Sequence, residues 1–274
     1  MIAFAGNSLL CRLALKSTDI DAASFTTIRL LSGAVMLWVL VRSGAQGQVG
    51  KGNWFSAFAL FIYAAGFSFA YLGLSAAMGA MLLFGSVQVT MISYGLSRGE
   101  RLHGLSLAGV LIALAGFIGL LLPGISAPPL LQSLLMSLAG VAWGVYSLRG
   151  KDAGDPLQIT AGNFLRAAVI AVVSCLVFYP FTTANVELDF QGIAYAICSG
   201  AITSGLGYAL WYSVLAFLKT TTAAIMQLSV PAIAALGGVF LLQEPISIRL
   251  LLASIAILGG ITVVIFRKTG NSTG

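Results

Sequence analysis

Residues 53–97 read NWFSAFALFIYAAGFSFAYLGLSAAMGAMLLFGSVQVTMISYGLS, a run of 45 residues without a single charged side chain. A bilayer core of about 30 Å is crossed by about 20 apolar residues in a helix, so this run is too long for one crossing. We therefore predict two membrane helices, over residues 53–74 and 76–97. Run length alone places a tight turn between them, within Gly73–Gly79.

The composition of the whole chain agrees with this prediction. Hydrophobic residues make up 59% of the 274 residues and charged residues only 8%, whereas about a quarter of the residues in a soluble globular domain are charged. The mean hydropathy is +1.00. Apolar runs of membrane length follow one another almost from end to end, so a long soluble domain is excluded.

Charges, prolines and polar clusters divide the chain into ten apolar segments. Their predicted ranges are 1–16, 22–43, 53–74, 76–97, 104–122, 129–149, 157–180, 191–217, 220–242 and 247–267. The predicted fold class is an all-α integral membrane protein with ten transmembrane helices. The first run, Met1 to Leu15, reaches only about 22 Å at about 1.5 Å per residue, so a truncated first helix is expected.

The distribution of Lys and Arg predicts the orientation of these helices. Three of the 14 basic residues lie within helices, and two, Lys16 and Arg249, lie at one end of the bundle. The other end collects Arg42, Lys51, Arg98, Arg101, Arg149, Lys151, Lys219, Arg267 and Lys268. Because basic loops stay in the cytoplasm, both termini are predicted to be cytoplasmic. The net charge of +6 thus reflects topology and indicates no nucleic-acid partner.

The two halves of the sequence match weakly, which indicates an internal repeat. Arg12 and Arg29 recur 137 positions later as Arg149 and Arg166. A second match pairs Ser86-Val87-Gln88 and the following Glu100 with Ser229-Val230-Pro231 and the following Glu244.

The predicted repeats are residues 1–124 and 125–274, with five helices each. Since five is an odd number, the second repeat must enter the membrane upside down. Two inverted halves can exchange conformations, which is the architecture of alternating-access transport. The alternative is a duplicated packing unit, in a membrane scaffold that transports nothing.

Four features together resemble a known family. They are the ten predicted helices, Arg29 and Arg166 in the second and seventh helices, the stretch from Pro231 to Glu244 followed by Pro245, and the glycine-rich fifth and tenth helices. The chain resembles the drug/metabolite transporter superfamily, in its ten-helix, EamA-type branch of metabolite exporters. It is most similar to bacterial inner-membrane exporters of aromatic and other apolar amino acids. The resemblance implies efflux of a small metabolite, with another drug or metabolite class as the alternative.

Polar and aromatic side chains recur at helical spacing inside the predicted helices. An apolar cavity with a few hydrogen-bonding groups suits an amino acid with an apolar side chain. We predict that such a cavity is lined by Asn7, Tyr63, Phe67, Tyr71, Gln88, Trp143, Tyr146, Tyr208, Trp211 and Gln227. For each aromatic residue the alternative is a place in an interface belt or in lipid-facing packing.

Two arginines inside predicted helices require an explanation, because a charge at the bilayer centre costs roughly 3 kcal/mol on insertion scales. Arg29 lies within reach of Asp19 or Asp21 along the sequence. Arg29 and Arg166 are candidate anchors for a substrate carboxylate, and the alternative is a structural hydrogen bond to carbonyls at a helix end. Pro231 removes one backbone hydrogen bond and is a candidate hinge, with a static kink as the alternative.

All eight acidic residues fall in loops or at helix ends. Exchange of a proton for a cation generally requires an embedded carboxylate, so we predict a neutral or zwitterionic substrate rather than proton-for-cation antiport. The single histidine, His103, lies in a predicted loop, and no acid pair or ligand cluster suggests an enzyme. No catalytic role, cofactor or metal is therefore expected.

The expected partners are a small-molecule substrate and the lipid bilayer. The three cysteines fall inside apolar segments, where they are expected to be small buried side chains. Small-residue pairs such as Gly140 and Gly144 let helices approach closely. Packing within one chain explains them better than a dimer interface, so a monomer is favoured.

Overall fold

The computed structural model describes residues 1–43, 51–99, 104–122, 127–150, 155–178, 189–215 and 220–270, apart from the side chains of 106, 212, 215, 220–225, 228 and 265–270. No strand occurs among these residues. The helices are α1 (Ile2–Ser17), α2 (Ala22–Ser43), α3 (Trp54–Tyr71), α4 (Ala76–Ser97), α5 (Leu105–Leu121), α6 (Leu130–Gly150), α7 (Pro156–Phe178), α8 (Phe190–Ile197), the π-helix η2 (Cys198–Leu206), α9 (Gly207–Leu215), α10 (Thr220–Leu242) and α11 (Ile248–Gly270).

The helices follow the predicted segments closely. The predicted ranges 22–43, 76–97 and 220–242 coincide with α2, α4 and α10. The uncharged turn lies where run length placed it, because α3 ends at Tyr71 and α4 begins at Ala76. The main difference is the segment 191–217, which is divided into α8, η2 and α9.

Six helical stretches among the described residues are long and apolar enough to cross a membrane. They are Ala22–Ser43, Trp54–Tyr71, Ala76–Ser97, Leu130–Gly150, Pro156–Phe178 and Phe190–Trp211. Shorter apolar stretches occur at Leu107–Leu121, Ser229–Leu242 and Ile248–Val264. The chain is therefore an all-helical membrane protein with several crossings.

Some residues used in the sequence predictions lie outside the described residues. They are Glu100, Arg101, His103, Lys151, Lys219 and the predicted repeat boundary at 124 and 125. The side chains of Arg267 and Lys268 in α11 are likewise outside the description.

Short polar side chains mark where six of the helices begin. Each accepts a hydrogen bond from a backbone amide two or three residues further on, which satisfies an N–H group of the first turn that has no partner within the helix. The capping residues are Asp21, Asn53, Ser75, Asp155, Asp189 and Ser247. Three of the acidic residues are thus explained by helix capping at the membrane ends.

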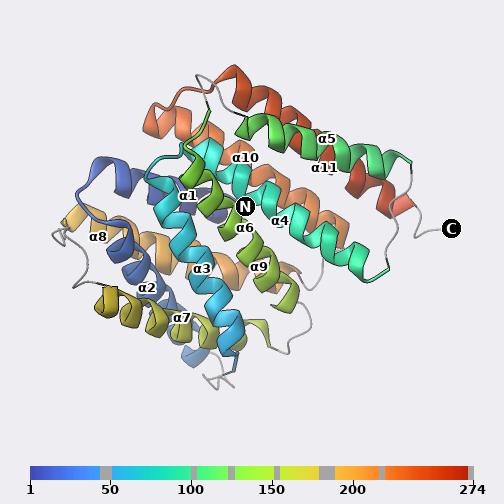
Figure 1. Cartoon of the computed structure of the whole chain (residues 1–274). Helices are drawn as coiled ribbons and strands as arrows, with labels where there is room; N and C mark the ends of the chain where they lie inside the picture. The colour runs from blue at the N-terminus through green and yellow to red at the C-terminus, as the bar shows by residue number, and fades with distance from the viewer. Residues whose placement is uncertain are drawn as a thin grey trace.

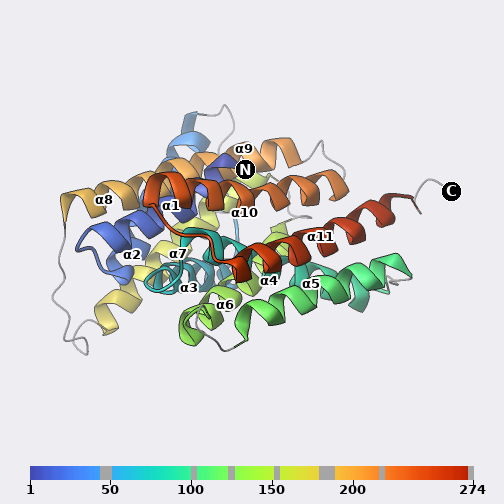
Figure 2. The same cartoon turned by 90° about the horizontal axis from the view of Figure 1, so that it is seen from above.

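Two groups of helices make up the molecule. In one group α3 packs on α6 and α7, α4 on α6 and α10, α2 on α7 and η2, and α1 on α10 and η2. The other is the pair α5 and α11, which lie side by side along one flank (Figures 1 and 2). Their backbones meet at Gly109 and Gly260, where a Cβ on either residue would collide with the carbonyl oxygen of the other.

Small residues also seat α6 against α4 inside the chain. A Cβ added at Gly140 would lie 2.5 Å from the carbonyl oxygen of Leu83, and one at Gly144 would lie 2.9 Å from the Thr90 side chain. The predicted small-residue pair is therefore used between two helices of one chain. Large apolar side chains point outward instead, such as Val173 and Leu176 of α7, as expected for a surface against lipid.

Candidate functional site

Nine aromatic rings from five helices form one connected cluster inside the bundle. The aromatic cluster consists of Phe4, Tyr63, Phe67, Tyr71, Trp143, Tyr146, Phe164, Tyr208 and Trp211. Trp143 of α6 lies at its centre, with its ring centroid 4.9 Å from Tyr63 and 5.0 Å from Tyr208. Such pairs contribute about 0.5–1.5 kcal/mol each beyond the burial of area.

The predicted site residues are brought together only in part. Seven of the ten predicted lining residues are rings of the aromatic cluster, and Asn7 joins them through Tyr63. Gln88 of α4 is buried and Gln227 of α10 is half-buried, but no hydrogen bond joins either amide to the cluster within the described residues. Pro231 is buried inside α10, which continues as a helix from Thr220 to Leu242. Its role as a hinge remains a prediction.

Asn7 connects α1 to α3 and to the π-helix. Its Nδ2 donates a hydrogen bond to the Tyr63 hydroxyl at 3.2 Å. Its Oδ1 accepts hydrogen bonds from Ser199 at 2.5 Å and from Thr203 at 3.4 Å. The Asn7 side chain is only 4% exposed, so these bonds meet the requirement that a buried amide be paired.

Arg29 of α2 lies against the aromatic cluster and is 1% exposed. Its Nη2 donates a hydrogen bond to the Tyr63 hydroxyl at 3.0 Å, and its Nε donates a longer one to Ser204 at 3.4 Å. The guanidinium carbon lies 4.9 Å from the ring centroid of Phe67. Removing such an ion from water costs several kcal/mol even in real proteins.

The expected acidic partner of Arg29 is absent from the described part of the structure. Asp21 instead caps α2, where its Oδ1 accepts from the amides of Ala23 and Ser24 at 2.9 Å. Among the described residues, an ion pair forms instead between Arg12 and Glu244. Spacing along the helix suggested the pairing, but capping holds the Asp21 carboxylate at the helix end.

Arg166, the predicted repeat counterpart of Arg29, has different surroundings. Its Nη1 donates hydrogen bonds to the carbonyl oxygens of Gly162 at 2.9 Å and of Lys51 at 3.3 Å. Its guanidinium carbon also lies 5.8 Å from the ring centroid of Trp54. Arg166 thus makes the carbonyl bonds that a structural role requires, whereas Arg29 bonds to side-chain hydroxyls.

The π-helix η2 supplies polar groups that sequence reasoning missed. Ser199 and Thr203 bond to Asn7, and Ser204 accepts the bond from Arg29. A Cβ at Gly200 would collide with the Arg29 carbonyl oxygen and the Ser32 side chain, so glycine there lets η2 lie directly on α2. The π-helix is rare and is found frequently at functional sites.

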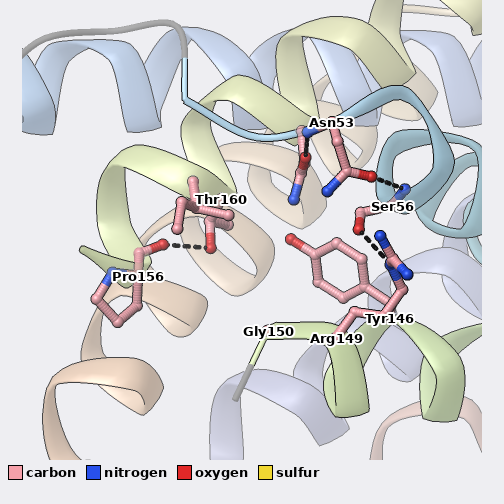
Figure 3. A pocket seen from close by; sticks show the side chains of 9 residues that line it. Asn53, Ser56, Tyr146, Arg149, Gly150, Pro156 and Thr160 are labelled. Atoms are coloured by element: carbon pink, nitrogen blue, oxygen red, sulfur yellow. Dashed lines mark hydrogen bonds between the residues drawn. The ribbon is translucent and has the colours of Figure 1, made fainter. Parts of the chain in front are cut away.

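A small polar pocket adjoins the aromatic cluster where α3 and α7 begin and α6 ends. Its volume is about 30 Å³, and its lining includes Ser56, Arg149 and Thr160. Figure 3 shows the Tyr146 phenol pointing into this pocket. The Tyr146 ring stacks on Trp143 at 5.6 Å, so a single ring separates the pocket from the centre of the cluster.

Arg149 lies at the rim of this pocket. It is exposed, and its Nε donates a hydrogen bond to the Ser56 hydroxyl at 3.1 Å (Figure 3). Its guanidinium carbon lies 4.7 Å from the ring centroid of Phe55. The pocket therefore carries positive charge at the first turn of α3.

An ion pair closes the opposite end of α3. Arg12 Nε donates to Glu244 Oε1 at 2.8 Å, while Arg12 Nη1 donates to the Tyr71 carbonyl at 2.8 Å. The second carboxylate oxygen of Glu244 accepts the amide of Ala76 at 2.7 Å. We call Arg12, Glu244 and their backbone partners at Tyr71 and Ala76 the clasp, because it ties α1, the α3–α4 turn and the α10–α11 connection together.

The sequence profile of the EamA-like transporter family matches residues 130–266, which is half of the chain. The chain belongs to the EamA-like transporter family. This result confirms the family predicted from the sequence, and it makes the chain a membrane transporter of the drug/metabolite type, with a small-molecule substrate.

Relatives of this EamA-like chain cover most of its length. An uncharacterized protein of Pseudomonas aeruginosa is 54% identical over 99% of this chain and 94% of that protein. An uncharacterized transporter of Archaeoglobus fulgidus is 26% identical over 89% of this chain and 87% of its own length. A probable amino-acid metabolite efflux pump of Escherichia coli is 23% identical over 71% of this chain and 69% of the pump.

A solved crystal structure has the same fold. It superposes with a TM-score of 0.66 over 97% of this EamA-like chain and 96% of the other chain, at 19% identity. At that identity the likeness concerns the fold alone. No three His, Cys, Asp or Glu side chains lie together as a metal site in the described residues.

Proposed function

We propose that this protein exports amino acids with aromatic or other apolar side chains across a bacterial inner membrane, by alternating access around the aromatic cluster. The observation that carries the proposal is the composition of that cluster. It joins nine rings with the buried hydrogen-bonding groups of Asn7 and Arg29. An apolar surface with a few placed polar groups is the chemistry that a zwitterion with an apolar side chain requires.

For a substrate to bind, the rings of the aromatic cluster would have to move apart. Trp143 and Tyr208 are 7% and 2% exposed, so their rings contact one another rather than solvent in this conformation. An incoming aromatic side chain would replace ring–ring contacts by contacts of the same kind. The proposed exchange of partners is therefore close to balanced in free energy, which suits a carrier that must also release its substrate.

The similarity to the Escherichia coli pump supports the substrate class. That protein is described as a probable amino-acid metabolite efflux pump. We extend this description to the present chain because the aromatic cluster is chemically suited to apolar amino acids.

The proposed architecture has ten membrane helices in two inverted repeats, residues 1–124 and 125–274. The pattern of helix contacts supports it. Helices α2, α4 and α5 pack against α7, α10 and α11, which would be their own repeat counterparts. In the proposed repeat, α3 corresponds to the α8–η2 segment and α6 corresponds to α1. The contact of α3 with α6 therefore matches the contact of the α8–η2 segment with α1. Counterpart helices meet in this way when a two-fold axis relates two halves.

We propose that the termini and the Arg149 pocket face the cytoplasm, and that the clasp faces the opposite side. The excess of Lys and Arg at the Arg149 end supports this orientation. The chain would function as a monomer. Proton-for-cation antiport is not part of the proposal, because the described acidic residues lie at helix ends or in the clasp.

Proteoliposome uptake tests the proposal. Purified protein is reconstituted and supplied with labelled tryptophan, phenylalanine, methionine or threonine, with and without an imposed proton gradient. We expect uptake of the apolar amino acids that does not depend on the gradient. Gradient-dependent uptake would overturn the coupling proposal, and no uptake of any amino acid would point to another drug or metabolite class.

A Trp143→Ala variant links transport to the cluster. The substitution removes the ring that contacts Tyr63, Tyr146 and Tyr208, and we expect uptake to fall at least tenfold at equal expression. Trp38→Ala is the matched control, because Trp38 is 47% exposed on α2. Equal transport by the Trp143 variant and the wild type would exclude the cluster as the substrate site.

A further inference from the structure

Arg29 is a buried, charged side chain that donates a hydrogen bond to a ring hydroxyl of the aromatic cluster. Its guanidinium has five N–H donors. Nη2 bonds to Tyr63 and Nε bonds to Ser204, and both acceptors are uncharged hydroxyls. These bonds orient the guanidinium without neutralising it.

The third nitrogen, Nη1, is buried and has no hydrogen-bond acceptor among the described residues. A buried donor normally has a partner, and an unpaired nitrogen of a guanidinium is especially costly. The contrast with Arg166 is direct, because there Nη1 bonds to two backbone carbonyls. A purely structural arginine uses its terminal nitrogens in that way.

No acidic side chain of the described residues offsets this charge. Asp19 is exposed, Asp21, Asp155 and Asp189 cap helices, and Glu244 pairs with Arg12. The cluster thus has a net positive charge at a place from which water is largely excluded. Such a site attracts an anion and repels a cation.

The rings beside Arg29 indicate what kind of molecule would carry the anionic group. The guanidinium carbon lies 5.2 Å and 4.9 Å from the ring centroids of Tyr63 and Phe67, and the ring centroid of Trp143 lies 4.9 Å from that of Tyr63. A ligand that places a carboxylate at Nη1 therefore has aromatic surface within a few ångströms for an apolar side chain. Arginine suits this task because its planar fork matches a carboxylate.

We propose that Arg29 binds the carboxylate of the transported molecule through Nη1. The proposal rests on the proposed function and narrows it. The ligand class is the carboxylates with an aromatic or apolar side chain, with or without an α-amino group, and amines that lack a carboxylate are rejected. Tyr63 and Ser204 are positioning residues, since they orient the guanidinium.

Binding to the full-length protein in detergent micelles tests the ligand class. The probes are L-phenylalanine, 3-phenylpropanoate and 2-phenylethylamine, which share one ring and differ in their charged groups. Because Trp143 lies in the cluster, intrinsic tryptophan fluorescence is the readout. We expect the two carboxylates to bind wild-type protein and the amine to bind at least tenfold more weakly, in line with a charge-assisted hydrogen bond.

Variants of Arg29 test whether this residue binds the carboxylate. Arg29→Gln is expected to weaken binding of both carboxylates by about 10- to 100-fold, and Arg29→Lys to restore part of that loss because the charge is kept. Arg42→Gln, a change of an exposed arginine on the same helix, is expected to bind like the wild type. Size-exclusion chromatography establishes that each variant is folded. If Arg29→Gln does not fold, the comparison of the three probes on wild-type protein still shows whether binding requires a carboxylate.

The outcomes separate the two proposals. Wild-type protein that binds phenylethylamine as tightly as phenylalanine would overturn the role of Arg29 and leave the amino-acid proposal standing, as would undiminished carboxylate binding by Arg29→Gln. Wild-type protein that binds 3-phenylpropanoate but no amino acid would overturn the proposed function and leave the role of Arg29 standing. Binding of none of the probes would overturn both.

Discussion

At Tyr63 a single phenol oxygen accepts hydrogen bonds from two buried donors, Asn7 Nδ2 at 3.2 Å and Arg29 Nη2 at 3.0 Å. One of the donors is neutral and the other is charged, and they come from α1 and α2. The hydroxyl therefore joins three helices at the edge of the aromatic cluster. Removal of the Tyr63 hydroxyl would leave both donors buried and without this acceptor.

Replacing Tyr63 by Phe tests the value of this hydroxyl. Loss of an acceptor from buried donors costs about 1–3 kcal/mol, so we expect a drop of that size in the free energy of unfolding, measured by denaturant titration in detergent micelles. Tyr94→Phe is the control, because the Tyr94 hydroxyl accepts from Arg98 at 3.1 Å on an exposed surface. Such surface bonds contribute about 1 kcal/mol or less. Equal losses in the two variants would contradict a special role for Tyr63.

The sequence predicted the residue types of the site better than their partners. Helical spacing placed Tyr63, Phe67 and Tyr71 on one face, and they do contact one another. It did not reveal Phe4, which reaches the cluster from α1, or that Arg29 bonds to hydroxyls. Spacing describes a single helix, whereas such partners depend on how different helices are rotated toward each other.

At the scale of elements, the contact of α2 with η2 depends on Gly200. A Cβ there would meet the Arg29 carbonyl oxygen and the Ser32 side chain. We expect Gly200→Ala to lower the free energy of unfolding by about 1–3 kcal/mol, the usual cost of overpacking. Gly119→Ala in α5 is the control, since nothing lies within 4 Å of a Cβ at that position, and alanine favours a helix by up to about 1 kcal/mol. A neutral Gly200→Ala would mean that η2 can shift away from α2.

The strength of the Arg12–Glu244 ion pair in the clasp can also be tested by mutation. Arg12 and Glu244 are 16% and 7% exposed, so their ion pair is only partly screened by water. A double-mutant cycle with Arg12→Gln and Glu244→Gln is expected to give a coupling free energy of about 1–3 kcal/mol, measured by denaturant titration. Lys51 and Asp155, which form no ion pair with each other in the structure, supply the control cycle. A coupling below about 0.5 kcal/mol would show that the clasp does not hold its three segments together.

Helix boundaries were predictable because composition determines them. Apolar runs and capping residues such as Asn53, Ser75 and Asp189 mark the ends. The π-helix was not predictable in the same way. Residues 198–206 read CSGAITSGL, and no proline or charge in that stretch signals a change of helical geometry. Ser199, Gly200 and Ser204 contact α1 and α2 there, and contacts between segments cannot be read from the sequence of one segment.

At the scale of the whole molecule, the two ends of the bundle differ in charge and in the contacts that close them. One end carries the clasp and Lys16, whose Nζ donates to the Leu242 carbonyl at 3.0 Å. The other end carries the Arg149 pocket and, among the described residues, also Arg42, Lys51 and Arg98. An excess of basic residues favours the cytoplasmic side, so this asymmetry predicts an orientation that accessibility can measure.

Single cysteines at Asp19 and Lys51 test the orientation. Both residues are exposed and lie on either side of α2, in a background in which Cys11, Cys175 and Cys198 are replaced by serine. On intact cells a membrane-impermeant maleimide is expected to label Asp19→Cys and to leave Lys51→Cys unlabelled; permeabilised cells, in which both must react, are the control. The reverse pattern would invert the proposed topology and place the clasp in the cytoplasm. Labelling of both from outside would mean that α2 does not cross the membrane, which would remove the basis for assigning the two ends of the bundle to opposite sides.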